Sequence, residues 1–155
     1  MSDAVNMLKL VAELPKRPRG RACVVLTHDY LGQRAWAAEL ASQTSADHID
    51  LLERAAADEE LGNAVSTISA TDLLPWLQKQ SQSQVLVVSG IEFLTATWAA
   101  RATSMEQFAS QIEMWSKTPA LLIVTQHDST LANREFTRFR QYTFVVNQRD
   151  TLALT

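Results

Sequence analysis

The stretch ACVVLTHDYLGQRAWAAELAS, residues 22–42, decides the fold. It opens with the apolar run Cys23–Leu26, passes through the polar turn Thr27–Gly32, and continues as an alanine-rich segment with helical spacing. A continuous apolar run of this length is typical of a strand that is buried on both faces, as in a parallel sheet. We therefore expect a buried strand over 22–27, a short loop, and a helix over about 32–42.

Further apolar runs and helical segments alternate along the rest of the chain. The runs Val85–Val88 and Ala120–Val124 are as continuous as the first, and shorter extended segments are expected at 48–52 and 142–146. Strands that are apolar on both faces and are separated by helices favour a parallel sheet covered on both sides. The sequence therefore predicts an α/β fold, a three-layer sandwich with a mainly parallel central sheet of about five strands.

Local patterns predict where several elements begin and end. Ser104 and Gln107 form a capping-box pattern, which would place Ser104 at the cap of a helix. Asp128 or Ser129 would cap another helix that runs toward Arg138. Residues 151–154 would add a terminal hairpin strand.

One domain is expected, because 155 residues are close to the usual size of a single domain. Residues 1–14 form a predicted amphipathic helix that ends at Pro15. Residues 15–21 form a basic connector, and residues 22–155 form the core. The connector is expected to be a solvated linker, and the alternative is a contact for an acidic partner or a phosphate.

Composition narrows the function classes. The net charge of −3 and the pI of about 5.6 argue against a whole-surface attraction to nucleic acid, but a local basic patch stays open. The single cysteine, Cys23, lies in the first strand and is expected to be an inert buried thiol. No apolar stretch approaches the ~20 residues of a membrane span, and polar residues precede the first apolar run. We expect a cytoplasmic protein that contacts no membrane.

Polar residues follow the strands at the edge where parallel sheets bind ligands. The three strand ends are Thr27–Asp29, Ser89–Glu92 and Thr125–Asp128. In this layout residues 22–146 resemble P-loop NTPases of the RecA/AAA-like class. The resemblance implies a nucleotide-binding remnant made of Thr27, His28, Asp29, Gly32, Gln33, Arg34, Glu92 and Gln126.

The loop departs from the phosphate-binding pattern of that family. When GxxxxGK[ST] is aligned on Gly32, Thr27 replaces the first glycine, Gln33 replaces the lysine, and Arg34 replaces the serine or threonine. Asp29 adds negative charge, and Ser89 stands where a Mg²⁺-binding aspartate would follow the strand. We therefore expect no cofactor and no ATP hydrolysis, while weak binding of ATP with Mg²⁺ stays open.

Two further groups of residues suggest other chemistry. If the first and fourth core strands are neighbours, as in a RecA-like domain, His28, Asp29, His127 and Asp128 come together and are weak candidates for a metal site. Arg134 and Arg138, four residues apart, would share one helical face, and with Arg140 and the connector they would form a basic patch. The alternative for the arginines is a solvated helix face with Phe136 and Phe139 in the core.

The expected function is a non-catalytic subunit or adaptor of a bacterial multiprotein complex. The chain is similar to small P-loop-type accessory subunits of phage-defence loci such as BREX, which implies an antiviral setting and a protein partner. One alternative is a nucleotide-binding ATPase or switch that uses Arg34 and Glu92 in place of the usual residues. Another is a metal-dependent phosphohydrolase at the two His-Asp strand ends. A homo-oligomer and a contact with DNA stay open.

Overall fold

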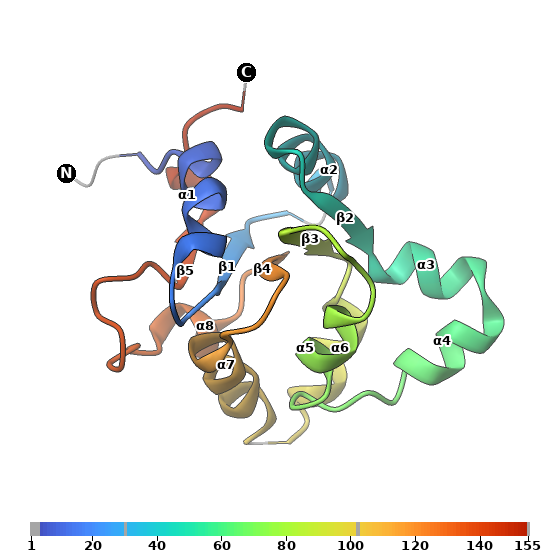
Figure 1. Cartoon of the computed structure of the whole chain (residues 1–155). Helices are drawn as coiled ribbons and strands as arrows, with labels where there is room; N and C mark the ends of the chain where they lie inside the picture. The colour runs from blue at the N-terminus through green and yellow to red at the C-terminus, as the bar shows by residue number, and fades with distance from the viewer. Residues whose placement is uncertain (1–3, 30, 102, 155) are drawn as a thin grey trace.

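A five-stranded parallel sheet forms the centre of the molecule (Figure 1). The computed structural model describes residues 4–29, 31–101 and 103–154. The strands lie in the order β2-β3-β4-β1-β5. Their bounds are β1 Ala22–Thr27, β2 Asp47–Asp50, β3 Val85–Ser89, β4 Ala120–Gln126 and β5 Val145–Asn147. The predicted α/β fold with a parallel sheet of five strands is confirmed.

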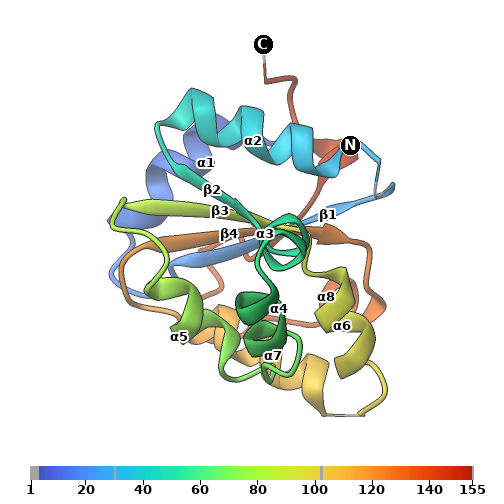
Figure 2. The same cartoon turned by 90° about the vertical axis from the view of Figure 1, so that its right-hand side faces the viewer.

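Helices cover both faces of the sheet, as Figure 2 shows. On one face lie α1 (Met7–Glu13) and α2 (Gln33–Thr44), with the short helix η1 (Leu14–Lys16). The opposite face carries α5 (Leu73–Gln78), α6 (Glu92–Trp98), α7 (Ser104–Met114) and α8 (Ser129–Asn133). Two further helices, α3 (Leu51–Ala57) and α4 (Glu59–Val65), project beside β2 (Figure 1). The short helix η2 (Gln148–Asp150) follows β5.

The apolar runs divide their side chains between two cores, because successive residues of a strand point to opposite faces. In β1, Cys23 and Val25 join the core under α1 and α2, whereas Val24 and Leu26 join the larger core under the other helices. Burial raises the pKa of the Cys23 thiol to about 12, so this residue is a structural thiol.

Several predicted element ends are wrong. The strand predicted at 48–52 is Asp47–Asp50, because the Asp50 carboxylate caps α3 and Leu51 already begins that helix. Helix α7 begins at Ser104 after Thr103, and no side-chain capping bond forms there, so the capping box is absent. Residues 151–154 form no hairpin strand, since Thr151 pairs in parallel with Val5 through an isolated bridge.

Helix α8 is shorter than predicted. Asp128 caps it as expected, accepting a hydrogen bond from the Leu131 amide at 3.0 Å. The helix ends at Asn133, however, because Arg134 adopts an extended backbone with ψ of 136°. Arg134 and Arg138 therefore do not share a helical face, and that prediction is wrong.

Candidate functional site

The connection from the buried strand β1 to helix α2 lacks the lysine of a phosphate-binding loop. Gly32 precedes α2 in the left-handed conformation, with φ of 82°. That conformation turns the chain sharply from the end of β1 into the helix. The amide groups of the first helical turn could still favour an anion. Gln33, which stands in the lysine position, is directed into the protein and is 2% exposed.

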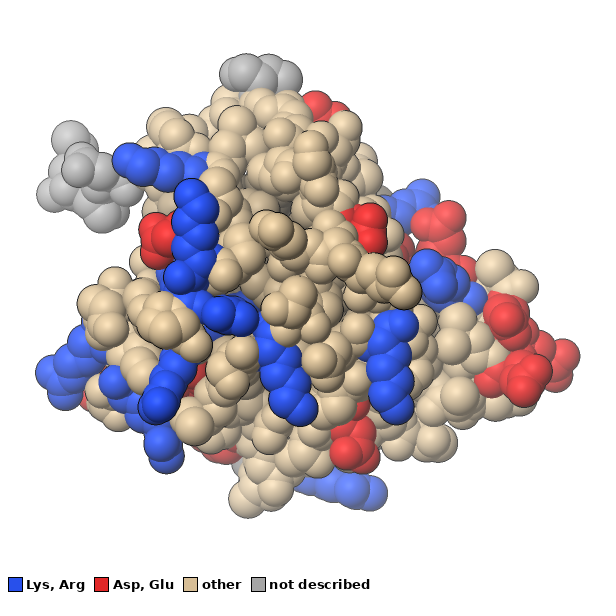
Figure 3. Space-filling model, viewed as in Figure 1, with Lys and Arg blue, Asp and Glu red and all other residues tan. Residues whose placement is uncertain are grey.

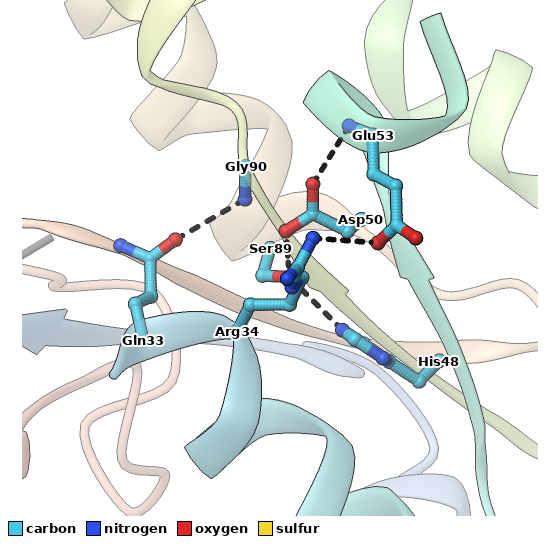
Figure 4. A network of polar contacts seen from close by, with 7 residues as sticks. All are labelled: Gln33, Arg34, His48, Asp50, Glu53, Ser89 and Gly90. Carbon is cyan, nitrogen blue, oxygen red and sulfur yellow. Dashed lines mark hydrogen bonds and ion pairs between the residues drawn. The ribbon is translucent and has the colours of Figure 1, made fainter. Parts of the chain in front are cut away.

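Gln33 joins the ends of two strands and a helix. Its Nε2 donates to Glu92 Oε2 at 2.7 Å and to Thr27 Oγ1 at 3.3 Å. Its Oε1 accepts from the Gly90 amide at 3.2 Å, as Figure 4 shows. Both ends of the amide side chain are therefore bonded within the protein. A glutamine held in this way is unavailable to a phosphate.

Glu92 is the centre of these bonds. It is the first residue of α6. In addition to Gln33, its Oε2 accepts from the Gln126 amide at 2.7 Å and from Thr125 Oγ1 at 3.3 Å. Its Oε1 is buried without a hydrogen-bond partner. Glu92 thus ties α6 to the end of β4, whereas the Gln126 side chain is exposed and contributes only its backbone.

A second network, which sequence reasoning missed, lies beside the first (Figure 4). Ser89 Oγ donates to Asp50 Oδ2 at 2.8 Å and lies 2.9 Å from His48 Nε2. Asp50 Oδ1 in turn accepts from the Glu53 amide at 2.9 Å. Ser89 is completely buried, so it cannot meet a substrate as a nucleophile. Burial is the largest effect on His48 and lowers the pKa of its imidazole below the usual value, which favours the neutral ring.

Arg34 is engaged with helix α3. It is exposed and forms an ion pair with Glu53 at 2.9 Å between Nη1 and Oε2. The pair stands at a pocket of about 640 Å³ between α2 and α3. Its apolar lining comes from α2, from α3 and from Leu31, which precedes α2. The 88% exposed Leu31 and the 43% exposed Leu52 of α3 are its largest apolar side chains. We call this pocket the α2–α3 groove.

Of the two His-Asp strand ends, the structure brings the histidines to one pocket but not the aspartates. Because β1 and β4 are neighbours, as predicted, His28 and His127 line one pocket of about 280 Å³. Asp128 is occupied with the cap of α8, and Asp29 is exposed. Within residues 4–29, 31–101 and 103–154, no three potential ligands lie close enough to hold a metal ion.

The arginines after α8 differ from one another. Arg134 pairs with Glu106 at 2.6 Å and with the buried Glu113 at 3.7 Å. Arg138 and Arg140 are exposed, and the Arg138 amide donates to Glu113 Oε2 at 3.1 Å. Arg134 is therefore neutralised within the chain, and the predicted basic patch of Arg138 and Arg140 stays a prediction.

Comparison with known proteins found no matching family model, no matching curated protein and no matching solved structure. None of the helices in the described part of the chain has the length and apolar character needed to cross a bilayer. The chemistry of the site must therefore be argued from its own residues.

Proposed function

We propose that the protein is a non-catalytic, P-loop-like subunit or adaptor of a bacterial multiprotein complex. The parallel sheet and the β1–loop–α2 path support a P-loop-like scaffold. Phosphoryl transfer by such a scaffold needs a lysine at the β- and γ-phosphates and a hydroxyl on Mg²⁺. Gln33 and Arg34 provide neither group. The phage-defence setting follows from the sequence resemblance.

The observation that carries the proposal is the state of Gln33. The side chain in the lysine position is buried and bonded to Glu92, Thr27 and Gly90, all within the chain. Opening this position for a phosphate would break these bonds and leave the Glu92 carboxylate beside the incoming anion. Both changes cost free energy, since buried polar groups need partners and like charges repel.

The α2–α3 groove is the surface best suited to a protein partner. Leu31 and Leu52 are exposed next to alanines of both helices, and a charged pair stands at their side. Apolar anchors within a polar rim are the usual composition of a protein interface. The carboxylates of Asp58, Glu59 and Glu60 follow at the α3–α4 junction, so the groove fits a partner segment with apolar and basic side chains.

Co-purification from a native host tests the adaptor function. Wild type, Leu31→Asp and the matched variant Leu152→Asp are compared, because Leu152 is also exposed, at 48%, but lies outside the groove. We expect at least one protein to be recovered with wild type and Leu152→Asp and lost with Leu31→Asp. That protein is then purified and its complex with wild type measured by gel filtration. Identical recoveries from all three would refute this docking surface.

Nucleotide binding is tested separately by thermal unfolding. We expect ATP with Mg²⁺ to leave the melting temperature unchanged, because a ligand raises it only by binding the folded state. A rise that Arg34→Ala removes would favour the nucleotide switch instead.

A further inference from the structure

The amino edge of the sheet carries a group of exposed positive charges. It is formed by the connector 15–21, by the turn 116–119 that precedes β4, and by the segment 138–143 that leads into β5. These segments contribute Lys16, Arg19, Arg21, Lys117, Arg138 and Arg140, which we call the amino-edge cluster. All six are exposed except Arg21, which is half-buried.

Contacts within the protein hold the three segments together. The Arg21 amide donates to the Trp115 carbonyl at 2.6 Å, and its Nη1 reaches the Ser116 carbonyl at 3.4 Å. These bonds place the connector beside Lys117.

On the other side of the connector, the buried Arg17 lies 4.5 Å from the Tyr142 ring centroid and donates to the Thr143 carbonyl. That contact places the connector beside the segment with Arg138 and Arg140. Contacts within the protein therefore hold the three segments that carry the cluster in fixed positions relative to one another.

The charges of the cluster are not neutralised locally. In the part of the chain that the structure describes, no carboxylate lies within ion-pair distance of any of the six. Two acidic residues of the neighbouring elements are engaged elsewhere, because Glu13 pairs with Arg17 and Glu113 pairs with Arg134. Figure 3 shows most of the visible positive charge on the left and centre of the face, with a few acidic side chains among it, and an excess of negative charge at the right, over α3 and α4. The net charge of −3 is thus unevenly distributed over this face.

We infer that the amino-edge cluster binds the phosphate backbone of nucleic acid. Unpaired arginine and lysine side chains are the groups that neutralise phosphates, and the arginine fork fits phosphate oxygens. An acidic protein partner fits less well, because protein interfaces usually have an apolar centre and few charges there. The exposed apolar side chains Leu31 and Leu52 lie in the α2–α3 groove instead. The inference is independent of the proposed adaptor function.

Fluorescence anisotropy with a labelled DNA duplex and a labelled single strand tests the inference. For four to six phosphate contacts, affinity is expected to fall by roughly 10²–10³-fold between 50 and 200 mM salt. The triple variant Arg19→Glu, Lys117→Glu, Arg140→Glu should weaken binding by at least about tenfold, since each change removes one attraction and adds a repulsion. None of these three side chains makes a hydrogen bond or ion pair in the described structure, so the variant should fold.

A charge-matched control separates a surface effect from a net-charge effect. Arg54→Glu, Arg101→Glu and Arg149→Glu change the net charge equally at exposed positions outside the cluster. We expect this triple to alter affinity less than about threefold. Equal losses from both triples, or no binding of either DNA at 50 mM salt, would overturn the inference. Competition by polyglutamate as strong as that by unlabelled DNA would also overturn the inference, because it would indicate an acidic polypeptide as the ligand. Binding to anionic vesicles without binding to DNA would overturn it as well and would indicate a membrane surface.

Discussion

The two edges of the sheet treat their polar side chains in opposite ways. At the carboxyl edge, the polar side chains bond within the protein: Gln33 bonds to Glu92 and to the Gly90 amide, and Ser89 bonds to Asp50. At the amino edge, the charged side chains of the cluster are directed into solvent without ionic partners in the described structure. A polar group that is satisfied internally supports the fold, whereas an exposed and unpaired one is free to meet a ligand. The edge at which parallel sheets usually bind ligands is here the more structural of the two.

The largest effect is expected from Gly90→Ala at the carboxyl edge. Gly90 has φ of 73°, and a Cβ there would lie 2.5 Å from Asp50 Oδ1. The substitution strains the backbone and displaces the carboxylate that caps α3 and holds Ser89, so we expect a loss of about 3 kcal/mol in unfolding free energy. Urea denaturation measures it.

Gly32→Ala is the matched control for this change. Gly32 also has a positive φ, of 82°, but a Cβ would meet no atom of the described residues within 4 Å. Only the backbone strain of about 1–2 kcal/mol should appear. Equal losses at the two glycines would show that the Asp50 network contributes little.

The second prediction separates two neighbours in the connector. Arg17 is 3% exposed and bonds the carbonyls of Gly20 and Thr143, while Arg19 is exposed and bonds nothing in the described structure. Arg17→Ala should cost about 2–3 kcal/mol, since it leaves two carbonyls without a partner and removes the contact with Tyr142. Arg19→Ala should change stability by less than about 0.5 kcal/mol. A stable Arg17→Ala protein would contradict a rigid framework for the cluster.

This contrast also marks what the sequence could and could not predict. The central strands were predictable because runs such as Val85–Val88 are apolar at every position, which is typical of a strand buried on both faces. The connector reads as uniformly basic, and nothing in its composition distinguishes Arg17 from Arg19. Their difference comes from Tyr142 and Thr143, more than a hundred residues away.

The sequence predicted several residues of the site but not the hydrogen bonds that join them. Gln33, Glu92 and Thr27 were candidates, but their mutual bonds depend on β1, β4 and β3 lying side by side. The His48–Ser89–Asp50 network was missed because it requires the register of β2 against β3, which pairs Asp50 with Ser89. The only sign of this network in the sequence was the alternation of polar and apolar residues over His48–Asp50, which indicated a strand there.

Glu92→Ala should have the third largest effect. The substitution removes the acceptor shared by Gln33 Nε2, the Gln126 amide and Thr125 Oγ1. Loss of these bonds is expected to cost about 2 kcal/mol, part of which solvent recovers because Glu92 is only partly buried. Glu39→Ala, at an exposed position of α2, is the control and should cost less than about 0.5 kcal/mol. If the Glu92 variant also gained affinity for ATP with Mg²⁺, this gain would show that the Glu92 carboxylate opposes phosphate binding at the carboxyl edge.

The smallest effect is a pH dependence at His48. Burial lowers the pKa of this imidazole in the folded protein, although Asp50 and Glu53 oppose the shift. Below the ordinary value of 6.5, the unfolded chain therefore binds a proton more readily than the folded one. The contribution of neutral His48 is complete above that pH and is lost as the pH falls toward the folded-state pKa. His48→Asn should lower stability by a constant amount through the lost bond to Ser89 and should show a smaller decline between about pH 8 and pH 5.5. Parallel declines in urea denaturation would mean that the imidazole gains its proton equally in both states, and that the carboxyl edge is more open to water than its bonds indicate.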